Sequence, residues 1–319
     1  MKLALRKMSN LLARSIPKPV LRYALKSVSY QAELQDSLRM HVKPYTYDSA
    51  IPTRFDLNLE QLKQKRVLPG FSLHESKILA LVDRLSVYAS ELKDVPLEKT
   101  GGAEFWFNNS SYQDGDAASL YCMIRHFKPR RIIEVGCGFS SRVMSIAARK
   151  NASEGSPIHC QFIEPYPTER MLMDRLAGPL LEKKVQDVSL DVFQELDSGD
   201  MLFIDTSHVL KTQNDCCYEY LQVVPSLKPG VLIHVHDIFT PYDYPAEWIL
   251  HNQFAFNEQY ALECLLSGNP RTEVLLPLYW LYKDHPEHAA KIFRSSSIRS
   301  AAFWFRFNAL SSTAPGSVP

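Results

Sequence analysis

The stretch Arg130-Arg131-Ile132-Ile133-Glu134-Val135-Gly136-Cys137-Gly138-Phe139-Ser140-Ser141 decides the fold. Its first half is a short run of β-branched residues, which predicts a strand covered on both faces. Gly136 and Gly138 follow, and glycine permits backbone conformations that other residues avoid. Ser140 and Ser141 are candidate caps for a helix that the pattern extends to position 148. A strand, a turn and a helix in this order direct free backbone N–H groups at an anion, so we expect a nucleotide-like ligand here.

Glu134 is the most informative residue of this stretch. An unpaired carboxylate inside an apolar strand is costly. It would repel the anionic pyrophosphate of a dinucleotide, whereas S-adenosylmethionine carries a cationic amino group and a sulfonium. The Gly-x-Gly spacing alone is weak evidence, but with the acidic residue it resembles motif I of the class I S-adenosylmethionine-dependent methyltransferases. The wider chain is similar to methyltransferase family 24.

The resemblance implies an α/β fold with a Rossmann-like, seven-stranded methyltransferase sheet, mostly parallel with the last strand antiparallel. Short apolar runs alternate with helical patterns from Phe105 onward, which favours the same fold class. Besides the strand in the opening stretch, strands are expected at 158–164, 184–188, 201–205, 231–237, 273–276 and 301–307. We expect three regions: a basic N-terminal segment and helical cap (1–104), a methyltransferase domain (105–308) and a disordered tail (309–319).

Several residues are candidates for binding the cofactor, and Glu164 is the strongest. It ends the second expected strand 26 residues after Gly138 (164 − 138), close to the spacing of an acid that accepts hydrogen bonds from ribose hydroxyls. Asp187 is a candidate acceptor from the adenine amino group, with an ordinary loop acid as the alternative. The resemblance places Tyr112 and Asp116 over the methionine end of the cofactor. The full expected set is Glu134, Gly136, Gly138, Ser140, Glu164, Asp187, Asp205, Tyr112 and Asp116.

Asp205 closes a buried strand in this interpretation, and His208 follows in the next turn. The resemblance implies an acid here that contacts cofactor or metal and, in some members, a histidine that deprotonates the acceptor. Histidine suits proton removal at neutral pH because its unperturbed pKa is about 6.5. His208 is therefore the candidate base, and a helix-capping or core histidine is the alternative.

The fifth expected strand ends in His234-Val235-His236-Asp237. Alternation places His236 and Asp237 on opposite faces, although a strand end can twist out of this rule. Asp205, His236 and Asp237 are candidate ligands of a divalent metal, magnesium or manganese, because the resemblance implies acids that hold magnesium at the ends of these two strands. His236 and Asp237 are also candidate catalytic residues. Histidine shifts the preference away from magnesium, so a metal-free network of acids and histidines is the alternative.

The bulk properties exclude several classes of protein. A net charge of +1 from 36 basic and 35 acidic residues is not the signature of nucleic-acid binding. The six cysteines form no C-x-x-C pair, which favours reduced thiols and a cytoplasmic location over a disulfide framework or zinc site. Apolar runs stay short of the roughly 18 residues that a membrane span needs, so we expect no transmembrane segment.

Residues 1–32 carry seven basic residues and no acidic one, interleaved with leucine and valine. This pattern is typical of a basic amphipathic helix that contacts anionic lipid or a partner protein, which would make the chain membrane-peripheral. The alternative is a solvated helix or loose extension interrupted by Pro17 and Pro19.

The sequence thus predicts an S-adenosylmethionine-dependent O-methyltransferase that acts on a small hydroxylated molecule or a sugar or glycan precursor. The Asn-Pro-Pro-Tyr signature of amino-group methylation does not follow Asp205. One alternative is a non-catalytic partner protein with this fold that docks through its basic N-terminus. Another is an NAD-dependent oxidoreductase, although Glu134 and a serine at position 141, in place of the third fingerprint glycine, argue against it.

Overall fold

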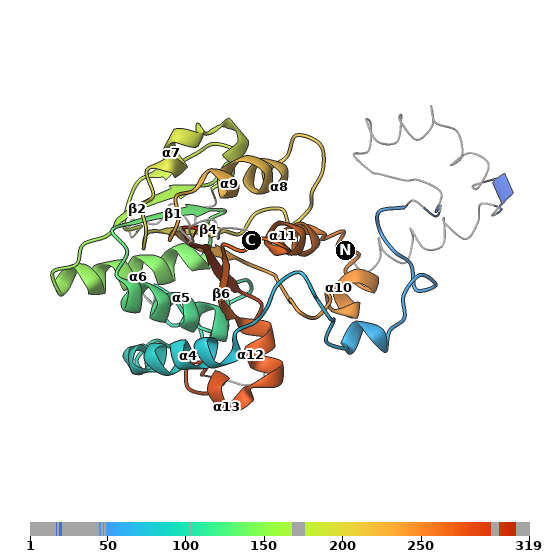
Figure 1. The fold of residues 1–319 in the computed structure, drawn as a ribbon. Coiled ribbons are helices and arrows are strands. Elements are labelled where there is room, and N and C mark those ends of the chain that lie inside the picture. The colour runs from blue at the N-terminus through green and yellow to red at the C-terminus, as the bar shows by residue number, and fades with distance from the viewer. Residues whose placement is uncertain are drawn as a thin grey trace, which may run out of the picture. The chain divides into compact units, whose positions relative to one another are not determined.

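The computed structural model describes residues 49–101, 104–167, 176–294 and 300–310, together with Pro17, Pro19, Val20, Tyr45 and Tyr47 (Figure 1). The chain divides into two compact units, Met1–Phe55 and Asp56–Pro319. The predicted basic helix in residues 1–32 lies outside the described residues except at positions 17, 19 and 20, and positions 311–319 of the predicted tail also lie outside them. No helix within the described ranges has both the length and the hydropathy to cross a membrane. The six cysteines are free thiols.

The second unit is built on one seven-stranded sheet with the order β3-β2-β1-β4-β5-β7-β6. Strands β1 to β5 run parallel, whereas β7 pairs antiparallel with both β5 and β6. The strands are β1 (Arg131–Val135), β2 (His159–Ile163), β3 (Leu180–Leu181), β4 (Met201–Ile204), β5 (Leu232–Val235), β6 (Thr272–Pro277) and β7 (Phe303–Phe307). The predicted fold class is confirmed. The antiparallel strand is β7, the last of the seven in the sequence.

One predicted strand is wrong. Residues 184–188 were expected to form the third strand, but Val185–Asp187 is a 3-10 helix (η3), and Leu180–Leu181 pairs with β2 instead. Val185 and Val188 are both buried in the core. Residues three apart face the same side of a 3-10 turn, so this turn buries both valines while the intervening polar residues face outward.

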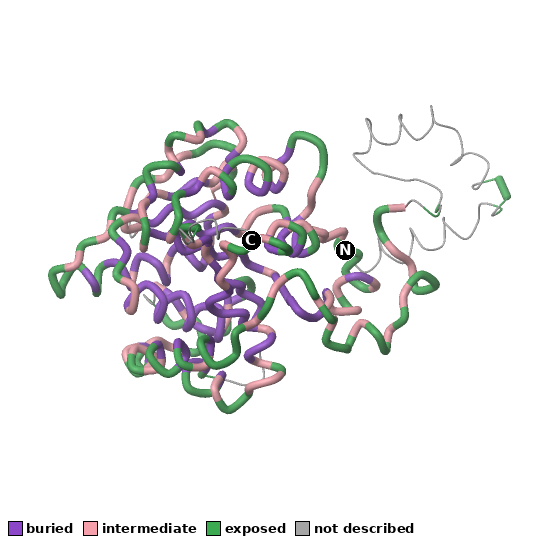
Figure 2. Tube along the Cα trace, in the orientation of Figure 1, coloured by how far each residue is buried: buried purple, intermediate pink, exposed green. Residues whose placement is uncertain are grey.

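Helices cover both faces of the sheet, and the alternation of β1 decides which core each residue joins. Ile132 joins a core that contains α4, α5, α6, α12 and α13, whereas Ile133 joins one that contains α7, α8, η4, α9 and α11. Figure 2 shows buried residues concentrated along the sheet and the inner helix faces. The helices are η1 (Gln61–Lys63), α4 (Glu75–Ala89), η2 (Ser90–Leu92), α5 (Asp114–Phe127), α6 (Phe139–Ser153), α7 (Leu190–Gln194), α8 (Asp215–Tyr218), the π-helix η4 (Glu219–Val223), α9 (Val224–Ser226), α10 (Ala246–Leu250), α11 (Glu258–Leu266), α12 (Leu278–Asp284) and α13 (Pro286–Ala289).

The start of α6 differs from the prediction. Gly138, and neither Ser140 nor Ser141, is the residue that precedes the helix, so both serines lie in its first turn. The Ser141 hydroxyl accepts a hydrogen bond from the Gly138 N–H at 3.0 Å. The Ser140 hydroxyl donates to a carboxylate oxygen of Glu134 at 2.5 Å. These serines therefore organise the turn by side-chain hydrogen bonds without being its caps.

Candidate active site

The tightest backbone approach at the carboxyl edge of the sheet occurs at Gly136. Its φ is 81°, in the left-handed region, and an added Cβ would lie 1.8 Å from the carbonyl oxygen of Asp205. Both observations require glycine there. Gly138 has a φ of −172°, which any residue adopts, and an added Cβ would meet nothing within 4 Å. The positive φ and the close backbone approach that require glycine are therefore found at Gly136 and not at Gly138.

Two cavities lie over this turn and share the lining residues Gly136, Glu164 and Asp205. The first has a volume of about 230 Å³ and is also lined by Tyr112, Ser140 and Arg142. The second has a volume of about 500 Å³ and extends over residues 184–186 and 211–215. The shared residues make them two halves of one cleft at the carboxyl ends of β1, β2 and β4. This is where open α/β sheets bind their ligands.

Glu164 lies between the two halves, just after β2. One carboxylate oxygen accepts a hydrogen bond from the Cys137 N–H at 3.2 Å, and the other accepts from the Tyr166 N–H at 2.8 Å. The backbone thus fixes an acidic side chain on the shared wall of the cleft. The expected role of Glu164 as an acceptor for two neighbouring hydroxyl groups stays a prediction.

Glu134 is fully buried on β1. Burial raises its pKa to about 8, hydrogen bonds from Ser140 and Ser141 act to lower it, and the charges of Asp205 and Glu164 act to raise it. Its second carboxylate oxygen has no hydrogen-bond partner among the described residues. Burial therefore favours the neutral acid in the free protein, whereas the sequence suggested a fixed negative charge.

The remaining expected cofactor residues are spread around the cleft. Tyr112 lines the first cavity, and its ring lies 5.1 Å from the ring of His236. Asp116 accepts hydrogen bonds from the N–H groups of Ala301 and Ala302, both at 2.9 Å, and so anchors the chain that leads into β7. Asp187 is exposed, and its neighbours at 184–186 line the second cavity in its place.

Four side chains gather beside the cleft, where β4 and β5 end. The His208 Nε2 atom lies 3.3 Å from Asp205 Oδ1 and 3.5 Å from Asp237 Oδ2. The His236 Nδ1 atom lies 3.5 Å from Asp205 Oδ1 and 3.5 Å from Asp237 Oδ1. Carboxylates and imidazoles therefore alternate around a common centre. We call these four residues the His–Asp cluster.

Backbone geometry explains why two adjacent residues both join this cluster. Strand β5 ends at Val235, and Asp237 has a φ of 56°. The chain thus leaves the alternating pattern before Asp237, and its carboxylate turns toward His236. The sequence rule that placed these two side chains on opposite faces does not apply at this position.

Each imidazole of the cluster also faces a carboxylate on its outer side. The His208 Nδ1 atom forms a 2.8 Å hydrogen bond with Glu258, and the His236 Nε2 atom lies 3.6 Å from Asp116. Burial lowers the pKa of both histidines, but the surrounding carboxylates outweigh it and raise the pKa well above the usual value of 6.5. Burial acts to raise the pKa of Asp205, and the two histidines lower it. Within the cluster, the carboxylates therefore favour the charged form of the two histidines, and the histidines favour the charged form of Asp205.

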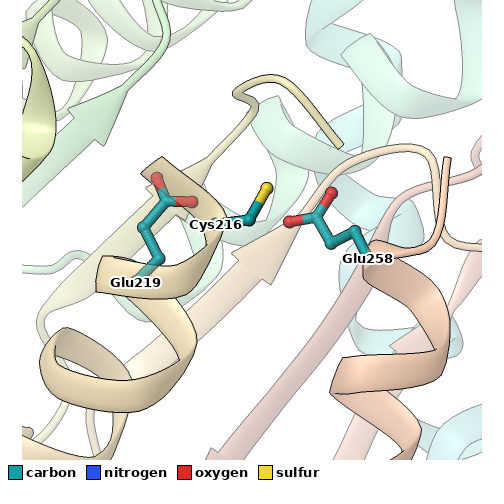
Figure 3. A group of neighbouring side chains, drawn as sticks. All are labelled: Cys216, Glu219 and Glu258. Carbon is teal, nitrogen blue, oxygen red and sulfur yellow. The ribbon is translucent and has the colours of Figure 1, made fainter. Parts of the chain in front are cut away.

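A second group of possible metal ligands (Figure 3) adjoins the cluster, since one of its members, Glu258, contacts His208. Donor atoms of Cys216, Glu219 and Glu258 all lie within 4.8 Å of one another, and all three residues are buried. In the part of the chain that the structure describes, Asp205, His236 and Asp237 do not form a group this compact. Burial raises the pKa of the Cys216 thiol and that of Glu219.

Two residues of the site were missed by sequence reasoning. Glu258 contacts His208 from 50 positions away, and no motif connects them. Arg142 lies one turn into α6 and lines the first cavity. Its position was visible in the sequence, four residues after Gly138 (142 − 138), but an arginine on a helix face is more often simply solvated.

Three solved structures are similar to the chain at low identity. CmcI-N160 with SAH has 14% identity over 69% of this chain and 91% of that chain, with a TM-score of 0.40. The apo structure of CalS11, a TDP-rhamnose 3'-O-methyltransferase, has 14% identity over 76% and 100%, with a TM-score of 0.39. The O-methyltransferase from Bacillus cereus in complex with SAH has 12% identity over 72% and 91%, with a TM-score of 0.34. Similarity at this level is too weak to specify a substrate or a mechanism.

Sequence comparison is more specific. An uncharacterized protein of Archaeoglobus fulgidus is 32% identical over 98 residues, which are 30% of this chain and 43% of that protein. The chain thus spans less than half the length of the curated relative it matches. Residues 133–238, from β1 to the end of β5, match the family-24 model described as a methyltransferase domain. The resemblance to this family noted in the sequence is therefore confirmed over these residues.

Proposed function

We propose that this domain transfers the methyl group of S-adenosylmethionine to a hydroxyl oxygen of a small molecule, such as a sugar or a glycan precursor. One observation carries the proposal. Asp205 lines both halves of the cleft and also contacts His208 and His236. A ligand in the cleft therefore contacts the His–Asp cluster through Asp205, and the histidines of the cluster lie directly behind this carboxylate, where an acceptor oxygen can lose its proton.

The cleft offers complementary groups for each part of the cofactor. Glu164 accepts hydrogen bonds from the ribose hydroxyls. Asp205 faces the cationic methionine amino group, and Glu134, buried just beneath, ionises more readily once a cation binds nearby. Arg142 provides positive charge in the first cavity and suits the methionine carboxylate.

The donor types of the His–Asp cluster suit a divalent metal, and its donor atoms would have to draw closer together than they lie in this structure to bind one. Asp205, His236 and Asp237 would hold it, and the Asp116 carboxylate beyond His236 matches the outer carboxylate that ligating histidines commonly have. A mixture of imidazole nitrogen and carboxylate oxygen favours manganese, iron or zinc over magnesium. A bound cation would lower the cost of ionising the acceptor hydroxyl.

In the mechanism we propose, His208 removes the proton of the acceptor. Its Nδ1 atom is engaged by Glu258, so Nε2 is the atom that faces the cluster. Burial acts to lower the pKa of His208, but the surrounding carboxylates raise it, and the positive charge of bound S-adenosylmethionine beside Asp205 would lower it again and leave Nε2 free to receive the proton. The sulfonium is already an activated leaving group, so the protein needs only to align the acceptor oxygen with the methyl group and accept its proton. The bond from sulfur to methyl breaks as the bond from oxygen to methyl forms.

The test is methyl transfer from labelled S-adenosylmethionine to a panel of hydroxylated sugars and phenols, with products analysed by mass spectrometry. We expect His208→Ala to lower kcat by about 100-fold or more and to leave S-adenosylhomocysteine binding intact. His159→Ala is the matched control. This exposed histidine is the first residue of β2, so it lies at the amino ends of the parallel strands, whereas the cleft lies at their carboxyl ends. Unchanged kcat in His208→Ala would exclude it as the base, and methylation at nitrogen would refute O-methylation.

A further inference from the structure

We propose that two residues at the start of α11 hold the loop after β4 in place, and that one of them, Glu258, is the positioning residue of His208. We call these two residues the clamp. The clamp consists of Asn257 and Glu258. This inference rests on the proposed function, in which His208 Nε2 is the atom that takes the proton. It adds a residue that contacts neither the cofactor cleft nor the acceptor in our proposal and acts through the imidazole.

The clamp holds the backbone of the loop. The N–H groups of Asn257 and Glu258 both donate to the carbonyl oxygen of His208, at 3.0 and 3.2 Å. The Asn257 side chain accepts a hydrogen bond from the Leu210 N–H at 2.6 Å. His208 has a φ of 59°, which a non-glycine residue adopts only when its surroundings stabilise it. These three hydrogen bonds supply that stabilisation.

The clamp also holds the side chain. Glu258 is fully buried, and its Oε2 atom pairs with His208 Nδ1 at 2.8 Å. Its Oε1 atom accepts a hydrogen bond from the Tyr220 hydroxyl at 2.9 Å. A carboxylate partner requires that Nδ1 carries the hydrogen, so Nε2 is the atom left to face Asp205 and Asp237. Backbone and side chain of His208 are thus fixed by the same turn.

Glu258 has a competing interpretation as a metal ligand with Cys216 and Glu219 (Figure 3). The hydrogen bonds favour the first interpretation, in which Glu258 positions His208. Both carboxylate oxygens of Glu258 are already engaged by His208 and Tyr220, and one oxygen of Glu219 accepts from the Thr206 hydroxyl at 2.9 Å. We therefore assign Glu258 to the imidazole, and the metal interpretation becomes an outcome of the test.

The test compares Glu258→Ala and Glu258→Gln with the wild-type protein. We expect Glu258→Ala to lower kcat by about 10- to 100-fold, with the KM for S-adenosylmethionine changed less than about twofold. Glu258→Gln should recover much of the loss, because its amide oxygen can still accept from Nδ1–H. Glu219→Gln is the matched control, a buried glutamate of the same group that makes no hydrogen bond to His208, and it should keep the wild-type kcat.

A second readout does not depend on any acceptor. In the ¹⁵N-edited proton spectrum, the wild-type protein should show a downfield Nδ1–H signal that is absent from both His208→Gln and Glu258→Ala. The wild-type protein could show the signal, and both variants lack it, while the wild-type protein transfers no methyl group. That result would support the clamp and reject the proposed function. Wild-type kcat in Glu258→Ala would overturn the clamp. Equal losses of activity and bound metal in Glu219→Gln, Cys216→Ser and Glu258→Ala would overturn it in favour of a metal site.

Discussion

Glu134→Gln should stabilise the protein more strongly as the pH rises. Glu134 is fully buried, and its pKa in the folded protein is about 8 against a usual value of 4.5. The folded protein therefore keeps this proton over a pH range in which the unfolded chain has already lost it. Because the folded state binds more protons, stability falls as the pH rises from about 4.5 to about 8. Glutamine is neutral in both states and removes this dependence.

The size of the effect follows from the pKa difference. A difference of about 3.5 (8 − 4.5) corresponds to at most about 5 kcal/mol. Between pH 6 and pH 9, linkage gives a loss of about 3 kcal/mol in the free energy of unfolding of the wild-type protein. That corresponds to roughly 4–5 °C in Tm for a chain of 319 residues. The glutamine side chain of the variant would still accept the hydrogen bond from Ser140, so packing should change little.

The assay is the Tm of both proteins, free of cofactor, at pH 6, 7, 8 and 9. We expect the Tm of Glu134→Gln minus that of wild type to grow by several degrees across this range. Glu182→Gln, at an exposed glutamate, should give a difference that does not vary with pH. A constant or shrinking difference for Glu134→Gln would show that Glu134 is ionised in the folded protein at neutral pH, contrary to our argument.

Two further variants test the cleft. Gly136→Ala should cost at least about 2 kcal/mol of stability, because the added Cβ meets the Asp205 carbonyl at a positive φ, whereas Gly138→Ala should fold with nearly wild-type Tm in thermal unfolding. Equal destabilisation by both would contradict the geometry of the turn. Arg142→Ala should weaken S-adenosylhomocysteine binding by about tenfold, and leave unchanged the binding of methylthioadenosine, which lacks the amino-acid carboxylate. Equal weakening of both ligands in calorimetry would remove Arg142 from the methionine end.

Local patterns made much of the sheet predictable. The β-branched run before Gly136 and the apolar runs that form β4 and β5 are each long enough to indicate buried strands, and Asp205 and His236 follow directly from where those strands end. Strand β3 has two residues, which are too few to show the alternation of apolar and polar residues that indicates a strand. The 3-10 turn at Val185–Asp187 resembles a strand in sequence because Val185 and Val188, the residue after the turn, are apolar and β-branched.

In the sequence, the four residues of the His–Asp cluster were candidates because acidic and histidine side chains closely follow the ends of two strands. Asp205 lies within 3.5 Å of both His208 and His236, because parallel strands bring their carboxyl ends to one edge of the sheet, and the roles of these residues stay predictions. Glu258 was not predictable, because its contact with His208 depends on how α11 packs against the loop after β4. The raised pKa of Glu134 was not drawn from the sequence, although its cause, burial of the strand on both faces, was predicted there.

Calorimetric titration of the chelator-treated protein with S-adenosylhomocysteine, with and without manganese, tests the central claim most directly. We predict binding at micromolar affinity by the wild-type protein and a loss of at least about tenfold in Glu164→Ala. NAD should not bind, and manganese should add a heat signal that Asp237→Ala removes. Absence of S-adenosylhomocysteine binding under every condition would contradict the assignment of the cleft to this cofactor and, with it, the proposed methyl transfer.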